Sequence, residues 1–95
     1  MRNDAYLDSL IEELGCPLIG FSVELAIIAY VVEAEEQTYH LMISRARDPY
    51  SLTRDSIPAS DVELWLSMHG GHPHMLSWSR TTESQVPFRL RQQVR

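Results

Sequence analysis

Apolar residues recur at helical spacing near the start of the chain, and acids fill the positions between them. The apolar stripe consists of Tyr6, Leu7, Leu10, Ile11 and Leu14. The acids on the other side are Asp8, Glu12 and Glu13. Asn3 or Asp4 can cap the first turn, and Gly15 can end the last one. This pattern predicts an amphipathic helix over residues 4–14.

Two stretches that follow are typical of strands. Residues 21–33 are rich in β-branched and aromatic side chains; they alternate at first and are then apolar on both faces, as in a central strand. A buried helix is the competing interpretation there. Residues 39–44 alternate like a half-buried strand, and the short polar segment 33–37 lies between the two stretches. Together they predict a long antiparallel hairpin.

The second half of the chain has a weaker pattern. Residues 47–59 contain Pro49 and Pro58 and read as a loop. Residues 60–69 begin with a capping-box pattern and are followed by Gly70 and Gly71, which favours a helix, although strict alternation over 62–68 keeps a strand open. Residues 74–80 alternate like a strand. In the tail, residues 86–90 alternate around Pro87 and could dock on a sheet edge, whereas 91–95 are expected to fray.

These elements predict an α+β fold in a small single domain spanning residues 1–95. The expected order is helix, long antiparallel hairpin, helix and strand, with the helices covering one sheet face. The alternative is a mostly β fold with an N-terminal helix and two hairpins, the second formed by residues 62–68 and 74–80. In either fold, a core of this size needs its large aromatic residues, Phe21, Tyr30, Trp65 and Trp78.

The composition restricts the class of protein and its expected location in the cell. The chain has 95 residues, of which 44% are hydrophobic, and this suits one globular domain with a modest core. Its longest strongly apolar run, residues 25–32, is far below the ~20 residues that a membrane-spanning helix needs. No apolar signal segment is visible near the start, and the single cysteine, Cys16, fits a reducing compartment. We therefore expect a cytoplasmic protein without membrane association.

Charge is distributed unevenly along the chain. Residues 1–36 carry eight acids and one base, whereas residues 37–95 carry seven arginines and five acids, for a net charge of −5. Such a chain is a poor nucleic-acid binder and a better partner for a protein with a basic surface. All eight basic residues are arginine, which is typical of a GC-rich bacterial or phage coding sequence. Whether Arg45, Arg47, Arg54 and Arg80 converge on an anion is left open.

Acidic residues gather in two places and form the first candidate site. Glu33, Glu35 and Glu36 lie at the predicted hairpin tip, and Asp8, Glu12 and Glu13 lie on the first helix. The structural interpretation is a solvated turn that discourages edge-to-edge aggregation. The functional interpretation is an acidic docking surface that occludes a basic surface of a protein partner.

Histidines form the second candidate site. Residues 69–74 hold three of the four histidines: His69, His72 and His74. Imidazole binds zinc and other transition metals, and a fourth ligand could come from Glu63, Cys16 or His40. The spacing H-x-x-H-x-H matches no standard zinc pattern, and a turn shaped by Gly70 and Pro73 explains it as well. The favoured expectation is therefore no metal and no cofactor.

No catalytic motif is visible. Cys16 follows a predicted helix end, where the helix does not lower a thiol pKa, so we expect a small buried apolar residue and no enzyme. The sequence favours a non-enzymatic protein-binding module: an inhibitor, immunity or anti-defence protein, for example of the anti-CRISPR type. The alternative is a metal-binding or metal-sensing domain that uses the histidine loop. A homodimer is compatible with both hypotheses, because a small sheet leaves edges to cover.

Overall fold

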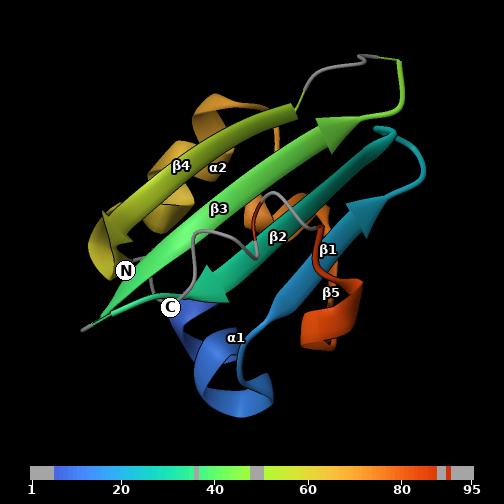
Figure 1. The fold of residues 1–95 in the computed structure, drawn as a ribbon. Coiled ribbons are helices and arrows are strands. Elements are labelled where there is room, and N and C mark those ends of the chain that lie inside the picture. The colour runs from blue at the N-terminus through green and yellow to red at the C-terminus, as the bar shows by residue number, and fades with distance from the viewer. Residues whose placement is uncertain (1–5, 36, 48–50, 88–89, 91–95) are drawn as a thin grey trace.

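The fold is an antiparallel sheet with helices packed on it, described here from a computed structural model for residues 6–35, 37–47, 51–87 and 90. The helices and strands follow in the order α1 (Tyr6–Leu14), β1 (Leu18–Ser22), β2 (Ile27–Glu33), β3 (Thr38–Arg45), β4 (Ser51–Pro58), α2 (Val62–Met68) and β5 (Ser77–Arg80). Short 3-10 turns occupy Ala59–Asp61, Pro73–Met75 and Glu83–Gln85. The five strands lie in the order β4-β3-β2-β1-β5 (Figure 1). The α+β class is confirmed.

The single long strand predicted over residues 21–33 is wrong, because the chain reverses in the middle of it. β1 and β2 are two antiparallel strands that pair from Leu18 with Val31 to Ser22 with Ile27. Residues 23–26 form the turn between them, in which the Leu25 N–H donates to Ser22 Oγ at 3.0 Å and Ala26 has a φ of 57°. This turn was missed because it contains no glycine, proline or asparagine, the residues that usually mark turns.

The loop predicted over residues 47–59 is also wrong, since β4 occupies most of it. β4 pairs with β3 from Thr38 with Pro58 to Ser44 with Ser51, with a bulge between Tyr39 and Leu41. In β4 only Ile57 is buried, so no periodic pattern of apolar residues marked this strand in the sequence. An edge strand is held mainly by its backbone hydrogen bonds, and therefore tolerates polar residues and a terminal proline.

The helix predicted over residues 60–69 is confirmed as α2. Gly70 adopts a φ of +87°, which glycine favours, and the Gly71 N–H donates to the Leu66 carbonyl at 2.7 Å. The mostly β description remains roughly consistent with five strands, but its second hairpin does not form, because residues 62–68 are helical. The strand predicted over 74–80 begins later, at Ser77, because Pro73–Met75 is a 3-10 turn.

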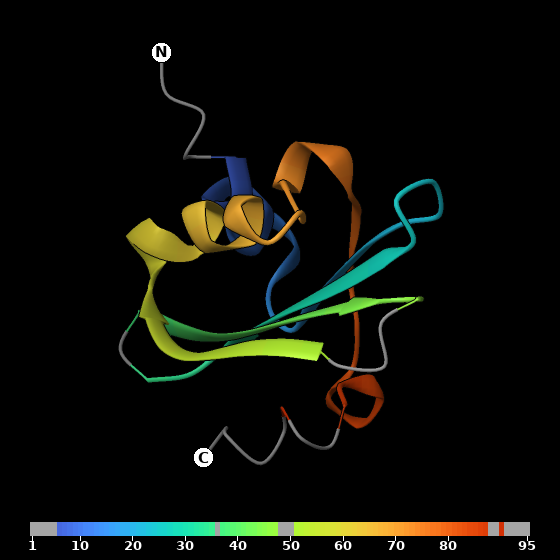
Figure 2. The same cartoon turned by 90° about the horizontal axis from the view of Figure 1, so that it is seen from above.

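The two faces of the sheet are covered differently. α1 and α2 lie on one face, and the 3-10 turn Glu83–Gln85 lies on the other (Figure 2). The larger core lies under the helices and consists of Leu7, Leu18, Ile27, Ala29, Val31, Tyr39, Leu41, Ile43, Ile57, Val62, Leu66 and Leu76. On the opposite face, Val86 and Leu90 pack with Val32 and Met42. The tail therefore docks on a sheet face and not on an edge; Phe88 and residues 91–95 lie outside the described residues.

Three side chains from other elements anchor the helix ends. Glu63 on α2 accepts a hydrogen bond from the Leu7 N–H in the first turn of α1 at 2.6 Å. Arg80 on β5 donates to the Leu14 carbonyl at the end of α1 at 3.2 Å. Arg45 on β3 donates to the carbonyl of His69, directly after α2. Each charge complements the helix dipole, and the two arginines do not share an anion site because β1 and β2 separate their strands.

No helix in the described part of the chain combines the length and apolar character needed to cross a bilayer.

Gly20 provides a test of the packing between β1 and β5. A Cβ at this position would lie 2.7 Å from ring atoms of Trp78, whose indole N–H donates to the Pro73 carbonyl at 2.9 Å and fixes the ring. We expect Gly20→Ala to lower the free energy of unfolding by about 1–3 kcal/mol, measured by urea denaturation. In a Trp78→Leu background the same change should cost clearly less. An equal loss in both backgrounds would contradict the predicted clash.

Candidate functional site

The first candidate site combines α1 with the turn between β2 and β3. We call it the acidic end and define it by five exposed residues: Asp8, Glu12, Glu13, Glu33 and Glu35. Glu36, the sixth predicted member, lies outside the described residues. β2 ends at Glu33, and α1 lies near this end of the sheet (Figure 1). The two predicted acidic groups are thus carried by elements at the same end of β2.

The turn between β2 and β3 presents its acids on a fixed backbone. The Ala34 N–H donates to the Thr38 carbonyl at 2.9 Å, and the Thr38 N–H donates to the Glu35 carbonyl at 3.0 Å. Gln37 takes a φ of 63° to close the turn. These hydrogen bonds close the turn that follows Glu33, and Glu33 and Glu35 are both exposed.

The pKa of Tyr39 is influenced by one acid from each predicted acidic group. It lies opposite Glu33 in the β2–β3 register and is buried. Burial raises the pKa of its hydroxyl above the ordinary value, and the nearby charges of Cys16, Glu33 and Asp8 raise it further. Asp8 on the helix and Glu33 on the sheet therefore both act on the same phenol. Glu12, Glu13 and Glu35 are exposed as well.

Cys16 lies beside the same group of acids. It packs against the main core, and burial raises the pKa of its thiol from 9.0 to about 11; the Glu33 carboxylate adds to this shift, and Arg80 opposes it. The thiol is therefore protonated near neutral pH, which disfavours it as a nucleophile or metal ligand. This environment agrees with the small apolar residue expected from the sequence.

Each of the three histidines in the loop at residues 69–74 contacts a different neighbour. The His69 ring lies 4.6 Å from Trp65, and the His74 ring stacks on Tyr6 at 4.1 Å. His72 Nδ1 accepts a hydrogen bond from the His74 N–H at 3.2 Å. Within the described residues, no three His, Cys, Asp or Glu side chains are grouped so that they could hold one metal ion. The metal hypothesis stays a prediction without geometric support.

The proposed fourth ligands are also engaged elsewhere. Glu63 accepts from the backbone of α1, as described above. His40 is buried between β3 and β4, where its Nδ1 accepts from the Ser56 N–H at 3.2 Å and lies 3.7 Å from Asp55 Oδ1. His40 therefore joins the two strands, a role that the sequence did not indicate.

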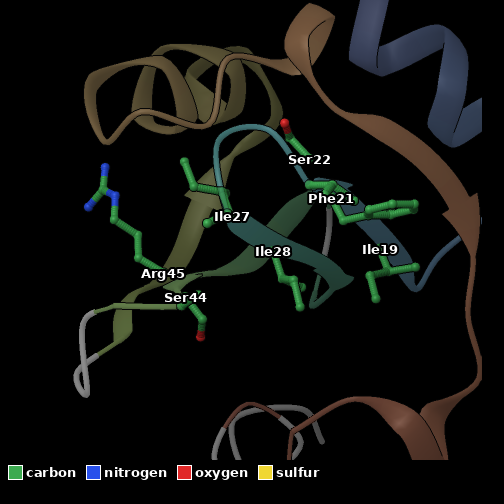
Figure 3. Close-up of a pocket in the computed structure, with 10 residues that line it drawn as sticks. Ile19, Phe21, Ser22, Ile27, Ile28, Ser44 and Arg45 are labelled. Atoms are coloured by element: carbon green, nitrogen blue, oxygen red, sulfur yellow. The ribbon is translucent and has the colours of Figure 1, made fainter.

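Sequence reasoning missed a second surface at the opposite end of β2. There the ends of β1, β2 and β3 enclose a hollow of about 470 Å³, which we call the apolar hollow (Figure 3). It is lined by Ile19, Phe21, Ser22, Val23, Ala26, Ile27, Ile28, Ser44, Arg45 and Ala46. Phe21, expected in the core, is 43% exposed, and Ile28 is 41% exposed. The available signal was the apolar composition of residues 23–26, which were assigned to a strand.

No protein-family model, curated protein or solved structure matches the chain.

The reactivity of Cys16 tests the electrostatics of the acidic end. With a thiol pKa near 11, we expect Ellman's reagent at pH 8 to react with the folded protein at least about tenfold more slowly than with the urea-unfolded chain. Glu33→Gln should speed the reaction of the folded protein, because the Glu33 charge disfavours the thiolate. Glu12→Gln, on the exposed side of α1, is the control and should have no effect. Equal rates for folded and unfolded protein would contradict the prediction.

Proposed function

We propose that the protein is a non-enzymatic protein-binding module whose acidic end binds a basic surface of another protein. The observation that carries the proposal is that the exposed acids of α1 and those at the end of β2 lie near the same end of the sheet (Figure 1). These exposed acids are Asp8, Glu12, Glu13, Glu33 and Glu35.

The surface suits electrostatic recognition. Its carboxylates are exposed, so they keep their hydration in the free protein and attract a cationic partner over a distance of about one Debye length, ~8–10 Å. Such charge complementarity contributes mainly to the association rate and to partner choice. The backbone beneath is held firmly: Leu7 and Tyr39 are buried, and Glu63 and Arg80 secure the two ends of α1. A preorganised surface loses little conformational entropy on binding.

Within this class, we favour a role as an inhibitor, immunity or anti-defence protein of bacterial or phage origin, acting in the cytoplasm. A small acidic module can block a cationic groove by occupying it, without chemistry of its own. The short chain, the acidic first third of the sequence and the exclusive use of arginine motivate this choice. The proposal assigns no catalytic residue.

Charge reversal at the turn tests the proposal. Immobilised wild-type protein should retain one or more basic proteins from a bacterial lysate, and Glu33→Arg/Glu35→Arg should raise the Kd of the isolated complex by about tenfold or more. Because exposed charges are screened by salt, the wild-type affinity should also fall as ionic strength rises. Quantitative mass spectrometry identifies the retained proteins, and titration calorimetry measures the Kd of the complex at each ionic strength.

Glu24→Arg is the matched control, since Glu24 is exposed in the β1–β2 turn at the opposite end of β2. This variant should bind the partner like the wild type. Thermal melts of all variants establish that the fold is kept. If the wild type retains no basic protein, or if Glu33→Arg/Glu35→Arg binds as tightly as the wild type, the acidic end is not the interface.

A further inference from the structure

His40 is a buried histidine on β3 that lies opposite the bulge in β4, the strand at one edge of the sheet (Figure 1). In the β3–β4 register, Asp55 and Ser56 together oppose His40. Two residues against one is a β-bulge, which bends an edge strand and hinders its pairing with another edge. The bulge is therefore built around a side chain that can take up a proton.

One ring nitrogen of His40 holds the bulge in place. Its Nδ1 accepts a hydrogen bond from the Ser56 N–H at 3.2 Å. Ser56 has a φ of 53°, a left-handed conformation that is unfavourable for a residue with a side chain. A ring nitrogen that accepts a hydrogen bond carries no proton, so the imidazole in this arrangement is neutral and has its proton on Nε2. The hydrogen bond to Ser56 thus requires the unprotonated ring.

A protonated ring would use the same nitrogen for a different partner. Asp55 Oδ1 lies 3.7 Å from His40 Nδ1. Both nitrogens of a protonated imidazole are donors, so Nδ1 loses the hydrogen bond from the Ser56 N–H and gains the Asp55 carboxylate as an acceptor. Asp55 is exposed, and an approach of about 1 Å brings its carboxylate within hydrogen-bond distance.

Other ionisable groups in the described residues are less well placed to act on His40. Tyr30 on β2 lies on the same face of the sheet, two residues before Val32, which pairs with His40. From the C-terminal segment, Glu83 lines a cavity together with Val32. Of the charged side chains that the structure describes, Asp55 is the one within ion-pair distance. The remaining ionisable residues of β2, β3 and β4 lie on the other face by the strand registers: Glu33, Tyr39, Arg45 and Arg54.

We propose that His40, Asp55 and Ser56 form a pH-sensitive switch that holds the bulge of β4 at neutral pH and releases it in acid. In the released state, Nδ1 donates to Asp55, and the Ser56 amide loses its partner and can leave the left-handed conformation. The edge of the sheet then changes shape within the range of about pH 5 to 8, in which histidine commonly titrates. This inference is independent of the proposed function, because none of its three residues belongs to the acidic end.

Amide hydrogen exchange measured by NMR between about pH 8 and pH 5 tests the switch. The protection factor of the Ser56 amide, which compares its exchange rate with that of an unstructured peptide at the same pH, should fall at least about tenfold as His40 titrates. Amides of β2 should stay protected, which distinguishes local release from global unfolding. The 15N spectrum of the His40 ring should show the tautomer with the proton on Nε2 at pH 8.

Three variants assign the response to its residues. In His40→Asn, the amide Oδ1 can accept in place of Nδ1 and does not titrate, so Ser56 should stay protected at both pH values. His72→Asn is the matched control, because the Nδ1 of the exposed His72 also accepts from a backbone N–H, that of His74, at 3.2 Å. It should leave the response of Ser56 unchanged. Asp55→Asn removes the charge that favours the protonated ring, so the midpoint of the fall should move to lower pH.

The proposal is overturned if the Ser56 protection factor stays constant while His40 titrates, or if His40 stays neutral down to about pH 5 in the folded protein. A pH response that persists in His40→Asn overturns it as well. If His40→Asn does not fold, Asp55→Asn decides: a midpoint at the same or a higher pH than in the wild type contradicts the switch.

Discussion

The structure depends on a central strand pair that is apolar on both faces. β2 and β3 place Ala29, Val31 and Leu41 under the helices, and Val32 and Met42 on the opposite side. A sheet of this kind cannot leave either face in water, because each buried aliphatic side chain contributes roughly 1.5–3 kcal/mol relative to an exposed one. α1 and α2 lie on one face, and Val86 and Leu90 pack on Val32 and Met42 on the other. Within the described residues, Phe21 and Ile28 at the ends of β1 and β2 stay exposed.

The same constraint explains how the charged residues are used. The helices must be held on the sheet, and the chain does this with single charges at their ends: Glu63 at the start of α1, Arg80 at its end and Arg45 after α2. Arginine suits this task because its guanidinium group stays charged and offers several donors to a carbonyl. Charges that anchor helices are not free to form an anion site. The acids of α1 and of the β2–β3 turn, in contrast, are exposed.

The two surfaces lie at opposite ends of β2 and have opposite chemistry. The acidic end carries exposed carboxylates, whose electrostatic field extends through solvent over about one Debye length, ~8–10 Å. The apolar hollow acts only at contact, and Phe21 and Ile28 each forgo about 1 kcal/mol of burial while it stays open. The two surfaces share no residue.

The sequence by itself determined the elements with strong periodicity. The stripe from Tyr6 to Leu14, the polar β2–β3 turn and the capping pattern before α2 predicted α1, one hairpin and α2, because in each case the local pattern and the burial agree. Only tertiary structure decided the rest. β4 is held by backbone hydrogen bonds, which leave no trace in side-chain pattern, and the apolar turn at residues 23–26 looks like a strand until the strands pair. The placement of α1 at the end of β2 and the hollow at its other end likewise depend on packing between distant segments.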